Sequence, residues 1–307
     1  MKINIKHYLK LLRPEISIMD ITLPLSSVIL ALNYSIYNYI SFHTLLYLLL
    51  LVIGSFFAIT SSYVFNDCLD IDVDIINLPD RPLPSGIINK KRAIIYGFIL
   101  ITIAFIISYY FNIQTFFILL ISFSIITCYS YYIKRVSPLS FLLVGLSYGL
   151  VPVGIWTSIN PFNFYFLENT IDLFYAPIPC IIFFIMICIT DFSFSLSGVC
   201  RDIIGDKNRN ILTFPVIYGI SITSKIIFLF WLIGTIFLVL LNLYSKFNIF
   251  NLIIIICSSI WILNKCYMFI KDATPKNGNK LFLRGSLYRS IIFISIIINI
   301  LLKIIII

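Results

Sequence analysis

Long apolar stretches separated by short polar segments run along nearly the whole chain of 307 residues. A helix that crosses the hydrocarbon core of a bilayer needs roughly 20 apolar residues. We therefore expect an all-α polytopic membrane protein. The pattern predicts nine spans, at residues 16–37, 43–66, 92–112, 114–132, 138–158, 173–195, 222–244, 249–270 and 286–306.

The composition supports this prediction. Hydrophobic residues make up 60% of the chain and charged residues 11%, and the mean hydropathy is +1.04. A soluble domain of this size would need far more polar surface. The seven cysteines form no CxxC pair, which argues against a disulfide framework and against a zinc site. No soluble basic domain is available for nucleic acid, and no obligatory protein partner is indicated.

The positive charges predict the orientation of the spans. With a cytoplasmic N-terminus, nine spans leave only Lys246 and Lys303 of the 22 Lys and Arg on the outer side. Cytoplasmic loops carry an excess of these residues, so we expect an inward N-terminus and an outward C-terminus. This count places Arg289, near the start of the last span, among the cytoplasmic charges. Without a targeting signal, the plasma membrane is the expected location.

An acidic cluster lies at the end of the second predicted span. Asp67, Asp70 and Asp74 occur at spacings i, i+3 and i+7, which would place them on one face of a helix. Asp72 falls off that face and is expected to be a solvated charge. Like charges this close repel unless a cation lies among them, and oxygen ligands suit magnesium far better than zinc. The three aspartates on the shared face are therefore candidate Mg²⁺ ligands.

A second acidic cluster follows the sixth span and contains Asp202 and Asp206. An even number of spans separates the two clusters, so both are expected on the cytoplasmic side. Mg²⁺ takes one or two carboxylates together with waters and phosphate oxygens. Two such sets would clamp a polyanion such as diphosphate, and the metals would stabilise the charge that grows on a leaving diphosphate. Nearby cations would complete the neutralisation: Arg13, Arg81, Lys134, Arg201 and Lys207.

Asp191 is a carboxylate within the sixth predicted span, 11 residues before Asp202. Ionisable residues inside a membrane are costly and usually functional. At about 100° per residue, this separation is three turns plus roughly 20°. A continuous helix would therefore place both aspartates on one face, with Asp191 deeper. It would orient an acceptor or take its proton, or else serve as a structural hydrogen-bonding group.

Each cluster is followed by a basic loop that contains proline, at residues 75–91 and 207–221. This repetition indicates two similar halves, roughly 1–135 and 136–285, with a site where they meet. Both halves would belong to a single membrane-embedded domain that comprises residues 1–307.

These motifs resemble those of the UbiA superfamily of intramembrane prenyltransferases. The first cluster matches the family's NDxxDxxxD motif from Asn66 to Asp74. NLPDRPLPSG at 77–86 resembles the loop after that motif, and DIIGDKNRNILTFPVIYG at 202–219 resembles the second motif with its tail. Weaker similarities are LLRPE around Arg13, YSYYIKR at 129–135 and GLSYGLVPVGIW at 145–156.

The resemblance implies nine helices in a single bundle around a lateral, lipid-accessible cavity, with both motifs binding Mg²⁺ and a prenyl diphosphate. Arg13 and Lys134 would contact the diphosphate, and Tyr129 would lie beside the prenyl or acceptor site. Gly198 replaces an Asp of some branches and Phe214 a commoner Leu, which blurs the branch but removes no presumed ligand. The metal and diphosphate roles would belong to Asn66, Asp67, Asp70, Asp74, Asp202 and Asp206.

The expected activity is Mg²⁺-dependent transfer of a prenyl group from an isoprenyl diphosphate, through an allylic carbocation, to a small or lipid acceptor. An aromatic ring of the quinone-precursor type is the leading acceptor, with porphyrin and glycerophospholipid acceptors still open. A terpene cyclase would use the same ionisation, with the substrate's own double bond as nucleophile. A cation or lipid-phosphate transporter is a distant alternative, because transporter sites generally lie near the bilayer midplane.

Overall fold

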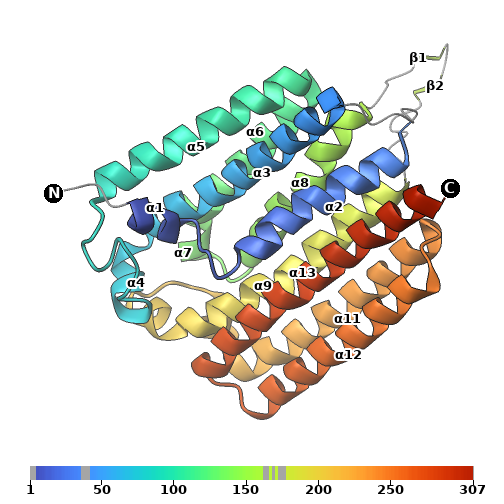
Figure 1. Cartoon of the computed structure of the whole chain (residues 1–307). Helices are drawn as coiled ribbons and strands as arrows, with labels where there is room; N and C mark the ends of the chain where they lie inside the picture. The colour runs from blue at the N-terminus through green and yellow to red at the C-terminus, as the bar shows by residue number, and fades with distance from the viewer. Residues whose placement is uncertain (1–4, 36–41, 162–165, 168–169, 172–177, 307) are drawn as a thin grey trace.

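The computed structural model describes residues 5–35, 42–161, 166–167, 170–171 and 178–306, almost all of them helical (Figure 1). A two-residue antiparallel strand pair, β1 (Phe166–Leu167) and β2 (Thr170–Ile171), is an exception to the all-α prediction. The helices are α1 (Ile5–Leu11), α2 (Ser17–Asn33), α3 (Phe42–Leu69), α4 (Ile71–Asn77), α5 (Lys90–Phe111), α6 (Ile113–Cys128), η1 (Tyr129–Ile133), α7 (Lys134–Val136), α8 (Phe141–Ile159), α9 (Ile178–Asn208), α10 (Phe214–Tyr218), α11 (Ile220–Tyr244), α12 (Ile249–Lys271) and α13 (Pro275–Ile306).

Eight helical stretches of the described chain are long and apolar enough to cross a membrane. They comprise α3, α5, α6 with its extension to Val136, α8, α9, α11, α12 and α13. The first predicted span corresponds to α2, which has 17 residues. At 1.5 Å per residue it is roughly 25 Å long, shorter than a hydrocarbon core of about 30 Å. The protein is thus a multi-pass membrane protein, while the count of nine spans stays a prediction.

Helix α9 lies at the centre of the bundle, where it packs against α8, α11 and α13. Small residues allow the closest of these approaches. A Cβ atom added at Gly149 of α8 would lie 2.3 Å from the sulfur of Cys188 on α9. On the other side of α8, α6 packs against it, and α5 packs against α3. The division into halves at residue 135 stays a prediction.

The boundaries differ from the predicted spans near both acidic clusters. The sixth span was predicted at 173–195, but α9 continues to Asn208 and carries the second cluster as part of the helix. The first cluster does not lie on one continuous helix, because α3 ends at Leu69 and Asp70 separates it from α4. Asp70 has φ −100° and ψ 12°, a bridge-region conformation in which the chain turns.

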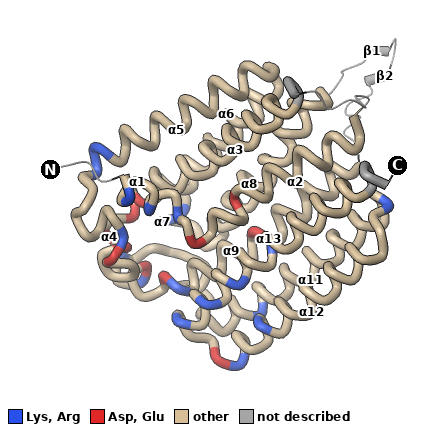
Figure 2. The backbone as a smooth tube through the Cα atoms, viewed as in Figure 1, with Lys and Arg blue, Asp and Glu red and all other residues tan. Residues whose placement is uncertain are grey.

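Charged residues gather at one end of the bundle, around α1, α4, α7 and the C-terminal end of α9 (Figure 2). A few others lie between the helices. Such a concentration at one end agrees with a charged membrane face, and it places both acidic clusters together. The cytoplasmic assignment of this face stays a prediction.

Candidate active site

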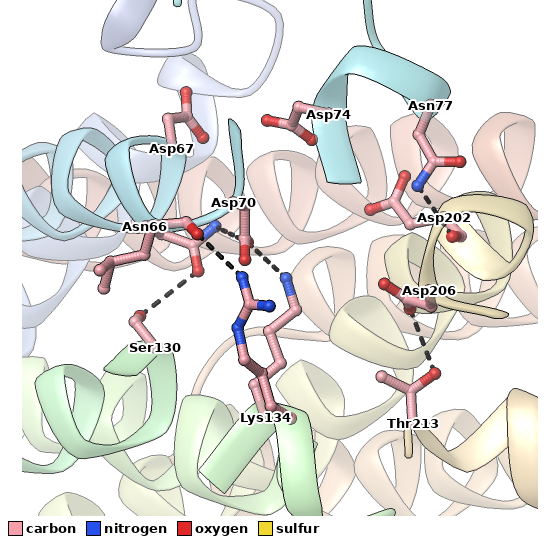
Figure 3. Close-up of polar contacts among 12 residues, drawn as sticks. Asn66, Asp67, Asp70, Asp74, Asn77, Ser130, Lys134, Asp202, Asp206 and Thr213 are labelled. Atoms are coloured by element: carbon pink, nitrogen blue, oxygen red, sulfur yellow. Dashed lines mark hydrogen bonds and ion pairs between the residues drawn. The ribbon is translucent and has the colours of Figure 1, made fainter. Parts of the chain in front are cut away.

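The two acidic clusters meet through the side chain of Asn77, the last residue of α4 (Figure 3). Its amide nitrogen donates to the carbonyl oxygen of Asp202 at 2.8 Å. Its amide oxygen accepts from the backbone N–H of Gly205 at 2.9 Å. A Cβ atom on Gly205 would lie 2.4 Å from the Asn77 nitrogen, so this approach requires glycine. From the sequence, Asn77 was expected only to belong to the loop after the first motif.

Two arginines hold the carboxylates of Asp67 and Asp74. Arg81 Nη1 lies 3.0 Å from Asp67 and 2.8 Å from Asp74, and Arg13 Nη2 lies 2.7 Å from Asp67. Burial raises the pKa of Asp74 to about 6, although the charge of Arg81 opposes this shift. Burial alone would lower the pKa of Arg13, but Asp67, with smaller contributions from Tyr63 and Asp74, raises it. These ion pairs keep buried charges neutralised.

Asp70 joins the end of α3 to the turn that follows α6. Lys134 donates to Asp70 Oδ2, and Asn66 Nδ2 donates to the same oxygen at 2.9 Å. Ser130 in turn donates to Asn66 Oδ1 at 3.3 Å. Ser130 belongs to η1, a π-helical turn that leads into Lys134. π-Helical turns often occur at functional sites, and this one directs two side chains toward the first motif (Figure 3).

In the second cluster, Asp202 and Asp206 have different environments. Arg201 makes two hydrogen bonds to Asp202, at 2.7 and 2.8 Å. Asp206 accepts from the Thr213 hydroxyl at 3.1 Å and, among the described residues, makes no ion pair. Lys207 is exposed, so its predicted substrate contact stays a prediction.

Asp72 lies outside this group, as predicted, but it is not a free solvated charge. Arg135 Nη2 lies 3.0 Å from Asp72 Oδ1, and 39% of the Asp72 side chain is exposed. The hydrogen bond from Arg135 lowers the pKa of Asp72 below its usual range. Neither Asp72 nor Arg135 lines the cavity into which Asp70 and Asp74 project.

A cavity of about 210 Å³ begins at the two clusters and continues between α3, α5, α6 and α8. A single water needs roughly 10–15 Å³, so this space is large enough for a ligand. The polar end includes Asn66, Asp70, Asp74, Tyr129, Lys134, Arg13, Arg201, Asp202 and Asp206, and the far end includes Leu51, Ile107, Thr115 and Ile155. Access to this cavity from lipid stays a prediction.

Asp191 also lines the cavity, on the same continuous helix as Asp202. Arg289 Nη1 donates to Asp191 at 2.6 Å, and Ser195 Oγ donates at 3.0 Å. Arg289 has 1% of its surface exposed, so it lies inside the bundle and not on a loop, and its assignment to the cytoplasmic side stays a prediction. An arginine within a membrane span is expected to form an ion pair with an acidic residue inside the bundle. Asp191, an acidic residue within another span, is that partner.

Asp20, which the sequence analysis did not consider, is a second carboxylate inside the bundle. It is fully buried in α2 and accepts hydrogen bonds from Tyr63 and Tyr148. Both tyrosines line the cavity. The signal for Asp20 was the same as for Asp191, a lone acid in an apolar span.

The residues at the polar end fit Mg²⁺ only if a substrate completes its ligands. In the part of the chain that the structure describes, no three His, Cys, Asp or Glu side chains form a metal cage of their own. However, Oδ1 of Asp70 and Oδ1 of Asp206 are buried without a hydrogen-bond partner. Unsatisfied buried oxygens are costly, and a cation would satisfy them. Mg²⁺ suits this arrangement because it commonly adds waters and substrate phosphates to one or two carboxylates.

Residues 25–297 match the UbiA prenyltransferase family. The chain belongs to this family. It is therefore a prenyltransferase, an enzyme class that transfers prenyl groups from isoprenyl diphosphates.

Among relatives of this UbiA-family enzyme, a digeranylgeranylglyceryl phosphate synthase of Methanosphaera stadtmanae is 27% identical over 277 residues, 89% of this chain and 92% of that protein. Protoheme IX farnesyltransferase 1 of Picrophilus torridus is 31% identical over 238 residues, 75% and 74% of the two chains. A solved UbiA homolog from Archaeoglobus fulgidus, bound to GPP and Mg²⁺, has a TM-score of 0.57 at 19% identity, with 94% of this chain and 99% of that chain covered. This last likeness concerns the fold.

Proposed function

We propose that the two aspartate motifs bind Mg²⁺ and the diphosphate of a long isoprenyl donor, and that the enzyme transfers the prenyl group to a hydroxyl of a glyceryl phosphate lipid. The observation that carries this proposal is the pair of unsatisfied oxygens on Asp70 and Asp206, which line one end of a cavity whose other end is mainly apolar. The diphosphate of the donor, with its metal, would match the polar end, and the prenyl tail would match the apolar end.

The chain's own cations would hold the diphosphate. Lys134 and Arg201 line the cavity, and each is kept in place by an aspartate, Asp70 and Asp202 respectively. Preorganised charges of this kind stabilise negative charge that develops on a leaving group. Mg²⁺, when bound, would supply further positive charge to the same oxygens.

The cavity would hold the prenyl tail along α3. Its lining on this helix extends from Leu51 to Asn66, roughly 22 Å at 1.5 Å per residue. Small side chains such as Gly54 and Ala58 leave this space open. The length suits a chain of several isoprene units, and the apolar walls would keep water from an allylic carbocation.

The acceptor proposed here differs from the aromatic ring that the sequence analysis favoured. The names of the relatives favour a glyceryl phosphate or haem acceptor over an aromatic ring. The match to the digeranylgeranylglyceryl phosphate synthase covers 89% of this chain, and the match to the protoheme IX farnesyltransferase covers 75%. Its name denotes a glyceryl phosphate that carries two geranylgeranyl groups. We propose that the present enzyme adds one such group to a hydroxyl of geranylgeranylglyceryl phosphate.

The test supplies the purified enzyme with Mg²⁺, geranylgeranyl diphosphate and one of three acceptors: geranylgeranylglyceryl phosphate, haem or 4-hydroxybenzoate. We expect a product mass that corresponds to one added geranylgeranyl group on the first acceptor, and no product after chelation of the metal. Asp206→Asn should lower the transfer rate at least 100-fold, about the loss expected for a major electrostatic group.

Other outcomes of this experiment contradict the proposal in separate ways. Product only from haem or 4-hydroxybenzoate would overturn the acceptor class. A terpene formed without any acceptor would indicate a cyclase. An Asp206→Asn enzyme with normal Mg²⁺-dependent turnover would contradict the assigned metal site.

A further inference from the structure

The carboxylate of Asp20 is fully buried beside two tyrosines that line the cavity, and these are its only side-chain partners among the described residues. Tyr63 donates to both of its oxygens, at 3.0 and 3.1 Å, and Tyr148 donates to Oδ1. These three residues come from α3, α8 and α2. Asp20 makes no ion pair with any described Lys or Arg. A buried charge without an ionic partner is costly, so its presence in an apolar helix requires a reason.

The two tyrosines lie just beneath the metal and diphosphate end. Tyr63 precedes Asp67 by one helical turn, roughly 6 Å along the axis of α3. The Arg13 guanidinium, which pairs with Asp67, lies 4.6 Å from the centre of the Tyr63 ring. The prenyl carbon next to a bound diphosphate would therefore lie at about the depth of this tyrosine.

Cations flank the group on both sides. Arg289 lies 4.8 Å from the centre of the Tyr148 ring and pairs with Asp191. The charges of Arg289 and Arg13 act on Asp20, and that of Asp191 acts on Tyr63. Together these groups, from α3, α8, α9, α13 and the segment before α2, form the electrostatic surroundings of Asp20.

The hydroxyl groups of Tyr63 and Tyr148 can each accept a hydrogen bond from a molecule in the cavity. A phenol has one hydrogen to donate and lone pairs that accept. Asp20 takes the hydrogen of Tyr63 and that of Tyr148. Each hydroxyl oxygen is thus left as an acceptor, on a residue that lines the cavity. A substrate hydroxyl is a donor that matches these acceptors.

We propose that Asp20, acting through Tyr63 and Tyr148, orients the acceptor hydroxyl and receives its proton. The inference rests on the proposed function. The bond between the allylic carbon and the diphosphate oxygen breaks, and a bond forms between that carbon and the acceptor oxygen. The acceptor's proton passes to a tyrosine oxygen as the tyrosine's own proton passes to the Asp20 carboxylate. Asp20 is then neutral until product release, when its proton returns to water by the same route.

The test measures transfer and diphosphate release separately, with geranylgeranyl diphosphate as donor and geranylgeranylglyceryl phosphate as acceptor. For Asp20→Asn we expect kcat for transfer to fall about 100-fold, the usual scale of general-base catalysis. The KM for the donor should change less than threefold. More diphosphate should be released per prenylated product, because water then competes for the cation.

A second variant covers the case in which Asp20→Asn does not fold. Tyr63→Phe/Tyr148→Phe keeps the carboxylate and both rings but removes the proton path, and should show the same uncoupling. Tyr288→Phe is the matched control. Tyr288 is buried and shares a 2.9 Å hydrogen bond with Ser259, so its loss tests a buried phenol outside the cavity. The Tyr288→Phe enzyme should transfer the prenyl group at more than half the wild-type rate.

Three results would overturn the inference. The first is a double variant that transfers at more than a third of the wild-type rate. The second is a double variant whose transfer rate falls no further than that of Tyr288→Phe. The third is a rise in the donor KM together with slower transfer, without excess diphosphate release. Each result would show that Asp20 has a structural role only. A wild-type enzyme that transfers no prenyl group to the hydroxyl acceptor would instead contradict the proposed function.

Discussion

Asn77 lies within hydrogen-bonding distance of Asp202, with its amide nitrogen 2.8 Å from the aspartate's carbonyl oxygen. The two residues are 125 positions apart in the chain. Through this contact, the short helix α4 that carries Asp74 is attached to the long helix α9 that carries Asp206. The separation of the two carboxylate sets therefore depends on a neutral side chain that binds no metal.

Asn77→Ala is expected to loosen this attachment. Two hydrogen bonds are lost, at a cost of about 1–3 kcal/mol if the partners stay buried. The Mg²⁺ concentration for half-maximal transfer should rise more than fivefold. Asn89→Ala is the matched control, because it removes the cap of α5 at a cost of about 1 kcal/mol without touching the site. An equal shift in both variants would contradict the role of Asn77.

Gly205→Ala is expected to inactivate the enzyme, because the added methyl group would clash with the side chain of Asn77. The added Cβ would lie 2.4 Å from the Asn77 nitrogen. In an Asn77→Ala background this clash is absent, and alanine is favoured over glycine within a helix by about 1 kcal/mol. The second substitution should then be neutral or stabilising in thermal unfolding. A penalty that is equal in both backgrounds would exclude the proposed contact.

Ala58→Phe is expected to shorten the accepted donor. Ala58 lines the cavity on α3, roughly 12 Å along the helix axis from Asn66. A phenyl ring at this depth should lower transfer of a geranylgeranyl group at least tenfold and spare a geranyl group. Ile53→Phe is the control, because Ile53 is exposed on the outer side of the same helix. Equal loss with both donors would argue against a tail path along α3.

Mg²⁺ with inorganic diphosphate is expected to stabilise the protein against heat. A ligand at 100 times its dissociation constant stabilises the folded state by about 2.7 kcal/mol. The effect should be present in Asp72→Asn, whose side chain pairs with Arg135 outside the site. It should be absent in Asp206→Asn. Thermal unfolding in detergent measures both, and stabilisation of the Asp206 variant would show that the ion binds elsewhere.

Local pattern was sufficient for much of the architecture. Apolar runs predicted the membrane-spanning helices, because hydropathy is a property of consecutive residues. The motif from Asn66 to Asp74 was visible for the same reason, and an even number of spans correctly placed both clusters at one end. Asp191 was found because a carboxylate stands out in an apolar stretch.

Only the tertiary structure decided which side chains become partners. Asp20 and Tyr148 are 128 residues apart, and Asp191 and Arg289 are 98 apart. No local period relates such positions, since they meet through the packing of separate helices. The turn at Asp70 was hidden for a related reason. The i, i+3, i+7 spacing is equally compatible with a continuous helix. In the structure, hydrogen bonds from Asn66 and Lys134 to Asp70 accompany the break, and Ser130 holds Asn66 in turn.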